Sequence, residues 1–132
     1  MAEHPQWVIN QKDYPIWQAP DLSRKVSLLV SKENCRAEHI SAGLFWLAPG
    51  HETVADIHPD AEEIYYVVSG EGKLVMDGEE FRVSEGMTVY ISAGVEHQSF
   101  NDGDEELIYF YAFGPPPTGA AKQQVEGWVK IQ

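Results

Sequence analysis

The chain lacks several features that mark whole classes of protein. Its 132 residues include a single cysteine, Cys35, so no disulfide can form within the chain. No stretch approaches the roughly 18 consecutive apolar residues of a membrane-spanning helix, and the N-terminus has no basic and apolar leader segment. We therefore expect a cytoplasmic protein without a membrane partner.

Basic residues are scarce in the middle of the chain. Residues 37–121 contain sixteen acidic residues but only two basic ones, Lys73 and Arg82, and the whole chain has a formal net charge of −12. Such an acidic surface repels the phosphates of DNA and RNA and attracts cations. The composition argues against a nucleic-acid partner and is compatible with a bound metal ion.

Short β-branched and aromatic segments with a period of two residues take up most of the chain. From Lys25 onward, turn residues separate these segments about every eight to twelve positions, which is typical of a β-sandwich or barrel. One such turn, Asp77-Gly78, favours a tight hairpin. The expected strands fall within residues 25–32, 39–48, 61–70, 72–83 (the hairpin), 86–92, 96–102 and 106–113.

These patterns predict one all-β domain with extensions at both ends. Residues 1–24 hold scattered aromatic residues and prolines and are expected to form an irregular N-terminal arm, with a short strand at residues 7–10. Residues 25–114 form the predicted barrel. Residues 115–132, which begin near "GPPPTG", form a C-terminal tail that packs on the barrel, with a short helix near residues 120–128.

Histidines and carboxylates recur at positions that a barrel would turn inward. Residues two apart in a strand point the same way, so Asp56 would share a face with His58, and Glu63 with Tyr65. His97 follows on a later strand. Imidazole and carboxylate groups together are ligands for first-row metals, and two His with one carboxylate make the facial triad of non-haem iron enzymes.

The spacing around these residues forms a first motif. Gly50 is followed by five residues, then "DIH" (56–58), four residues, Glu63, six residues and Gly70.

A second motif follows after the hairpin. Gly86, Gly94, His97 and Asn101 are spaced as Gly, five residues, x-x-Gly, two residues, His, three residues, Asn, with Ser92 at the first x. With these two motifs the chain resembles the single-domain cupins, small RmlC-like jelly-roll β-barrels. The resemblance covers roughly residues 40–113. Cupins carry His where this chain has Asp56, and Pro where it has Ser92.

The resemblance implies a metal site made by Asp56, His58, Glu63 and His97. One divalent ion per chain is expected, with Fe or Mn favoured by the mixed nitrogen and oxygen ligands and Zn, Ni or Co also compatible. The Asp leaves three alternatives open. In the first, Asp56 binds the metal directly as a ligand. In the second, it does not contact the metal but orients a metal-bound water or His58, and in the third the site is degenerate and metal-free.

The resemblance also implies a function. We expect a metal-dependent enzyme for a small oxygenated metabolite, either a dioxygenase or a lyase, isomerase or decarboxylase, in which Tyr65 moves protons. The alternative is a non-catalytic barrel that binds a small molecule. The cations of residues 37–121 lie on the hairpin, which in cupins is largely outside the site, so the metal and neutral donors are expected to hold the substrate. Cupins commonly dimerise, and a homodimer is expected.

Overall fold

Residues 4–116 and 127–132 are described by a computed structural model, and most of them lie in or between β-strands. The elements are a 3-10 turn Gln11–Asp13, β1 Trp17–Gln18, β2 Arg24–Val30, α1 Lys32–Cys35, β3 Ser41–Leu47, β4 Glu62–Ser69, β5 Glu71–Met76, β6 Glu79–Ser84, β7 Thr88–Ile91, β8 His97–Phe100, β9 Leu107–Gly114 and β10 Val129–Lys130. The strands predicted between residues 25 and 114 are all present. The turn of the β5–β6 hairpin places Asp77 and Gly78 at φ values of 49° and 81°, as this turn type requires.

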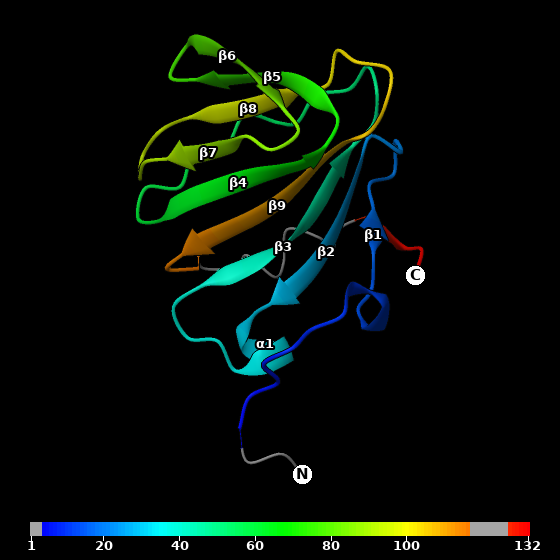
Figure 1. The fold of residues 1–132 in the computed structure, drawn as a ribbon, viewed down its shortest axis with the longest axis vertical. Helices are drawn as coiled ribbons and strands as arrows, with labels where there is room; N and C mark the ends of the chain where they lie inside the picture. Colours follow the sequence, from blue (N-terminus) through cyan, green and yellow to red (C-terminus); the bar gives the residue numbers. More distant parts are fainter. Residues whose placement is uncertain (1–3, 117–126) are drawn as a thin grey trace.

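The strands form two antiparallel sheets that curve around a common interior (Figure 1). The larger sheet has the order β10-β1-β2-β3-β9-β4-β7, and the smaller has the order β6-β5-β8. Non-consecutive strands such as β3, β9 and β4 are therefore neighbours, which brings residues far apart in the chain onto one wall. The arrangement confirms the all-β, jelly-roll prediction.

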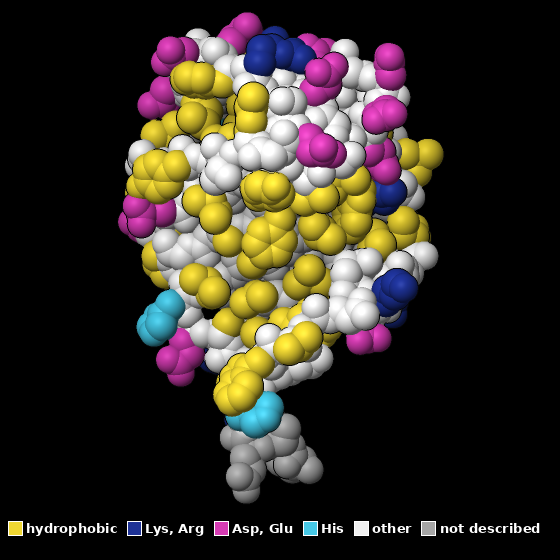
Figure 2. All heavy atoms as spheres, in the orientation of Figure 1, with side chains coloured by type: hydrophobic (Ala, Val, Ile, Leu, Met, Phe, Trp, Pro, Cys, Tyr) yellow, Lys and Arg dark blue, Asp and Glu magenta, His cyan; other side chains and the backbone are white. Residues whose placement is uncertain are grey.

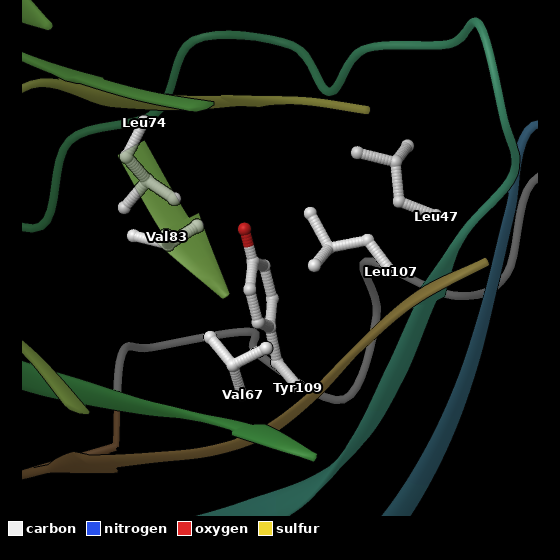
Figure 3. Packing of buried hydrophobic residues seen from close by; sticks show 6 residues of the cluster. All are labelled: Leu47, Val67, Leu74, Val83, Leu107 and Tyr109. Carbon is white, nitrogen blue, oxygen red and sulfur yellow. The ribbon is translucent and has the colours of Figure 1, made fainter. Parts of the chain in front are cut away.

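The alternation of side chains on β9 shows how the core forms. Leu107, Tyr109, Tyr111 and Phe113 are buried, whereas Phe110 faces outward and is 36% exposed. Burying one face of an antiparallel strand removes its apolar surface from water. Each Å² of apolar surface buried stabilises the fold by about 25 cal/mol. The buried side chains of both sheets meet in one cluster, shown in Figure 3, which consists of Leu47, Val67, Leu74, Val83, Leu107 and Tyr109.

A glycine on β3 makes room for an aromatic side chain on the inner wall. A Cβ atom at Gly43 would lie 2.2 Å from the Ser27 carbonyl oxygen and 2.9 Å from the Tyr111 hydroxyl oxygen. No side chain fits there without moving the backbone. The register places Tyr111 between Gly43 and Tyr65 across the sheet, so this glycine helps to set the inner surface next to Tyr65.

The ends of the described chain are tied to the larger sheet. β1 pairs with both β2 and β10, so part of the predicted irregular arm is a strand. Residues 7–10 form no strand, contrary to the prediction, and Trp7 and Val8 are 73% and 85% exposed. The predicted C-terminal helix falls almost wholly on residues outside the described ranges. Among the described residues, no helix has the length and apolar character that a membrane crossing requires.

Candidate metal centre

The predicted ligands come from three separate parts of the fold. Glu63 lies near the start of β4 and His97 begins β8, whereas Asp56 and His58 lie in the connection between β3 and β4. The assumption that Asp56 and His58 share a strand is therefore wrong. An isolated antiparallel bridge between Asp56 and His97, with two backbone hydrogen bonds of 2.9 Å, holds this connection in place instead. The carbonyl of His58 accepts a further 2.9 Å bond from the Gly94 N–H.

These elements bring all four side chains together at the wall of the barrel. The Glu63 Oε1 atom lies 3.4 Å from His58 Nε2 and 3.3 Å from His97 Nε2. Asp56 Oδ2 lies 3.6 Å from His58 Nε2. One ligand atom each from Asp56, His58 and His97 can be chosen so that all lie within 4.8 Å of one another. The chain therefore carries a candidate metal site.

Burial differs among the four side chains. Glu63 and His97 have side chains that are only 6% and 5% exposed, and that of His58 is 11% exposed, whereas that of Asp56 is 51% exposed. Asp56 Oδ1 also accepts a 2.8 Å hydrogen bond from the N–H of its neighbour Ile57. Three donors thus form an enclosed group, and Asp56 lies at its solvent side.

A buried carboxylate oxygen without a hydrogen bond supports a cation at this point. Glu63 Oε1 is inaccessible to solvent and forms no hydrogen bond among the described residues. A buried carboxylate is costly unless positive charge compensates it, and here that charge comes either from a metal ion or from the two facing imidazoles in their protonated form. The donor set of two imidazoles and at least one carboxylate also suits first-row divalent metals. The residues present therefore fit a metal ion.

The two imidazoles and Glu63 perturb one another. Burial alone would raise the pKa of Glu63, but the facing His58 and His97 outweigh it and hold this pKa below its usual value. The Glu63 carboxylate raises the pKa of His58 against the opposing effect of burial. Burial alone would lower the pKa of His97, yet Glu63 and the Val95 carbonyl together raise it. Without a metal, the cluster therefore favours charged imidazoles beside a carboxylate.

The hydrogen bond of His97 selects the ring nitrogen that can bind a metal. His97 Nδ1 lies 3.0 Å from the Val95 carbonyl oxygen, which can only accept a hydrogen bond. In the neutral ring the proton therefore lies on Nδ1, and Nε2 keeps its lone pair toward Glu63. Carbonyl groups commonly orient metal-binding histidines in this way.

The four side chains open onto a cavity of about 360 Å³, which is the size of a small-molecule site. Tyr65 lines this cavity beside Glu63, as predicted. Its ring stacks on Tyr109 with centroids 4.6 Å apart and meets His97 edge to face at 6.3 Å. Burial and the charge of Glu63 raise the pKa of the Tyr65 hydroxyl well above its usual range, so this group stays protonated.

Other expectations from the sequence can be placed as well. Glu62 faces outward beside the inward Glu63, and His39 and His51 are exposed. Asn101 is buried but donates its amide to the carbonyls of Leu47 and Glu105, so its role is structural.

One cation of the cavity was missed at the sequence level. Arg24, at the start of β2, lines the cavity together with Trp128 from the C-terminal segment. The expectation that the metal and neutral donors hold the substrate considered only Lys73 and Arg82 and left Arg24 out. The alternation of Arg24, Val26 and Leu28 along β2 could have revealed it, since all three line the cavity.

Comparison with known proteins supports this assignment of the fold. Residues 43–113 match the family described as the cupin domain. The chain belongs to the cupin family. The resemblance inferred from the two motifs is thereby confirmed.

Similar proteins occur in distant organisms. The chain is 36% identical over 67 residues to an uncharacterized protein of Methanocaldococcus jannaschii, in a match that covers 51% of this chain and 54% of that protein. It is 37% identical over 82 residues to an uncharacterized protein of Streptomyces coelicolor, covering 61% of this chain and 75% of the other. The chain thus spans about half the length of the first of these relatives.

Solved structures share the fold at low sequence identity. A predicted oxalate decarboxylase of Thermotoga maritima superimposes with a TM-score of 0.69 at 22% identity, covering 81% of this chain and 97% of that one. KdgF from a Halomonas species gives a TM-score of 0.69 at 15% identity, covering 89% and 96%. An RmlC-like cupin of Shewanella frigidimarina gives 0.68 at 20% identity, covering 86% and 92%. At these identities the likeness extends to the fold alone.

Proposed function

We propose that this cupin is an enzyme that depends on one divalent metal ion and acts on a small oxygenated metabolite in the barrel. His58, Glu63 and His97 hold the ion, and Asp56 completes the site from its solvent side. The observation that carries the proposal is the buried Glu63 Oε1 atom, which forms no hydrogen bond in the described part of the chain and lies within 3.4 Å of both imidazole nitrogens.

The ligand set bears on the choice of metal. Two nitrogens with one or two carboxylate oxygens suit Fe²⁺ or Mn²⁺, while Zn²⁺, Ni²⁺ and Co²⁺ also accept such donors. Two carboxylates compensate the charge of a divalent ion, so the loaded site is close to neutral. When bound, the metal supplies Lewis acidity toward a chelating keto, hydroxy or enediol group.

The residues around the site define what the chain itself contributes. The Tyr65 hydroxyl stays protonated, because burial and the charge of Glu63 raise its pKa, so it can donate a hydrogen bond to substrate. The stacked ring of Tyr109 fixes the orientation of Tyr65. A hydrogen-bond donor at this position can stabilise negative charge that develops on substrate, which suits lyase, isomerase or decarboxylase chemistry. Dioxygenation with Fe²⁺ is the other reaction class we propose.

The alternative function is a non-catalytic barrel that binds a small molecule, with a degenerate metal site. Asp56 favours it, because this side chain is half exposed and hydrogen-bonds to its own neighbour in the chain. A metal-free protein that still binds small molecules would support this alternative.

Elemental analysis of protein purified without chelators distinguishes the two functions. The enzyme proposal predicts close to one first-row metal ion per chain, and loss of the ion in Glu63→Gln. Glu62→Gln is the matched control, because Glu62 is the adjacent carboxylate on the outer face of β4. Absence of metal from the natural protein, together with no uptake of Mn²⁺, Fe²⁺, Ni²⁺ or Zn²⁺, would contradict the proposal.

We also propose a homodimer that forms through the outer face of the larger sheet. Ile64, Tyr66, Val68 and Tyr90 are between 40% and 55% exposed on this face. Figure 2 shows apolar side chains gathered across the middle of one face, where β3, β4 and β9 lie in Figure 1, with acidic groups around them. Light scattering of Tyr66→Glu should report a monomer, and an unchanged mass relative to the natural protein would contradict this interface.

A cytoplasmic location and the lack of a nucleic-acid partner stay predictions from the composition.

A further inference from the structure

The wall of the cavity carries a positive charge that the metal chemistry does not use. Arg24 is intermediate in exposure, and of the described residues that line the cavity it alone has a permanently positive side chain. Its guanidinium carbon lies 5.2 Å from the centroid of the Trp128 ring. A guanidinium that stacks on an aromatic face keeps its N–H groups free at the edge for a planar anion.

No carboxylate among the described residues occupies this guanidinium. Arg24 forms no ion pair with those residues, and it donates a long hydrogen bond of 3.3 Å from Nε to the Ser23 hydroxyl. The acidic residue nearest in sequence, Asp21, accepts hydrogen bonds from the hydroxyl and the N–H of Ser23. These bonds lower the pKa of Asp21 most, and the Arg24 charge lowers it further without a direct ion pair. Among the described residues, no carboxylate therefore forms an ion pair with Arg24, although the chain has a net charge of −12.

The adjacent basic residue of β2, Lys25, does form an ion pair. Lys25 points to the other face of β2, where its Nζ atom lies 3.2 Å from a Glu106 carboxylate oxygen and 5.6 Å from the Trp46 ring centroid. Two neighbouring cations therefore both lie over a tryptophan. One is paired on the outer face, and the other faces a cavity without a paired anion.

The charges of the cavity complement an anion at this point. Asp56 and Glu63 compensate a divalent metal ion, so Arg24 supplies the remaining positive charge of the loaded cavity. One guanidinium matches one carboxylate in charge and in bidentate geometry, whereas a phosphate dianion would call for further donors. The metal, the proton donor and this anion site would together select the substrate.

The sheet register places Arg24 far from the metal ligands. Arg24 pairs with Leu47 at one end of β3, whereas Glu63 lies in the row of Phe113 and Ser41 at the other end. At about 3.4 Å per residue the two rows are roughly 20 Å apart along the sheet, a span that side chains reaching inward from both ends shorten. A ligand that contacts both Arg24 and the metal site is therefore elongated.

We propose that Arg24, held by Trp128, binds a carboxylate at the end of the substrate remote from the metal. This inference rests on the proposed function, since it makes the substrate an elongated acid that chelates the metal at one end. It narrows the substrate class to oxygenated metabolites with a terminal carboxylate, and it replaces the expectation of neutral donors only.

Calorimetry with matched pairs of 2-oxo acids tests the proposal on Mn²⁺-loaded protein. The dicarboxylates are 2-oxoglutarate, 2-oxoadipate and 2-oxosuberate, and each is compared with 2-oxopentanoate, 2-oxohexanoate or 2-oxooctanoate, which lack the distal carboxylate. For at least one chain length, the dicarboxylate should bind about tenfold more tightly or better, as expected of a charge-assisted hydrogen bond. The phosphonate analogue of that dicarboxylate should bind no more tightly.

Variants then assign the preference to its residue. Arg24→Gln should abolish the preference, Arg24→Lys should retain part of it through charge alone, and Lys25→Gln should leave it intact. Thermal melting of each variant checks that the barrel is folded. The absence of a preference at every length, a preference that survives in Arg24→Gln, or tighter binding of the phosphonate would overturn the assignment.

Titration with Mn²⁺ alone separates this inference from the function on which it rests. Normal Mn²⁺ binding in the natural protein and in Arg24→Gln, without any carboxylate preference, would overturn the anion site alone. Failure of the natural protein to bind Mn²⁺ would overturn the proposed metal dependence and this inference with it.

Discussion

Replacement of His97 by Ala should remove most of the stabilisation that a metal confers on the fold. A ligand that binds only the folded state at about 100 times its Kd stabilises that state by about 2.7 kcal/mol. For a domain of this size, one kcal/mol moves the melting temperature by roughly 3 to 5 °C. Saturating Mn²⁺ should thus raise the melting temperature of the natural protein by roughly 10 °C.

The size of the loss follows from the position of His97. Its side chain is only 5% exposed, and its Nε2 atom lies 3.3 Å from Glu63. Loss of a group that merely orients a metal ligand costs about tenfold to a hundredfold in affinity, so loss of a ligand should cost at least a hundredfold. At the same Mn²⁺ concentration the stabilisation then falls to about 0.4 kcal/mol, which is a shift of roughly 1 to 2 °C.

Differential scanning fluorimetry with and without Mn²⁺ measures this difference directly. His39→Ala is the matched control, because the His39 side chain is 89% exposed and lies outside the cluster. The control should keep the full metal-dependent shift. An equally large shift in His97→Ala would refute the assignment of His97 as a ligand, whatever the melting temperature of the metal-free variant.

Three further changes test the site and its support. The pKa values of His58 and His97 are raised above the ordinary 6.5, so protons compete with the metal for these imidazoles. The Mn²⁺ affinity measured by calorimetry should therefore fall steadily as the pH is lowered from about 8 to 6, and a flat profile would contradict imidazole ligands. Tyr65→Phe should leave Mn²⁺ affinity within about twofold in the same titration, because the hydroxyl serves substrate and not metal; a large loss would make Tyr65 part of the metal site. Gly43→Ala should lower the free energy of unfolding by at least about 2 kcal/mol in urea titrations, because its Cβ would lie 2.2 Å from a backbone oxygen; an unchanged midpoint would show that β2 and β3 can separate.

The raised and lowered pKa values also set the stability of the metal-free protein. The raised pKa values of His58 and His97 contribute stability below their ordinary pKa of 6.5, which is lost as the pH rises through the folded-state values. The lowered pKa of Glu63 contributes stability above its ordinary 4.5, which is lost as the pH falls through the folded-state value. At pH values between the folded-state pKa of Glu63 and those of His58 and His97, the protonated imidazoles compensate the Glu63 carboxylate in place of a metal ion.

Much of the candidate site could be predicted from residue spacing. Turn residues and period-two segments located the strands, because a strand with one buried face must alternate. The spacing from Gly50 to Gly70 distinguished Glu63 from its neighbour Glu62, and the structure places these two on opposite faces. The geometry of Asp56 could not be predicted, because it lies in a connection whose position depends on one backbone bridge to His97.

The amino-acid sequence by itself determined the family, the all-β class and the residue types available for a metal, because these follow from local alternation and motif spacing. Tertiary structure alone decided which groups meet. Arg24 and Trp128 come from opposite ends of the chain and line one cavity because β1 pairs with both β2 and β10. Folding also buries Glu63 Oε1 between two imidazoles, where it forms no hydrogen bond with residues that the structure describes. Burial and pairing between distant strands are properties of the folded barrel, and they turn a set of candidate ligands into a site with a proposed substrate class.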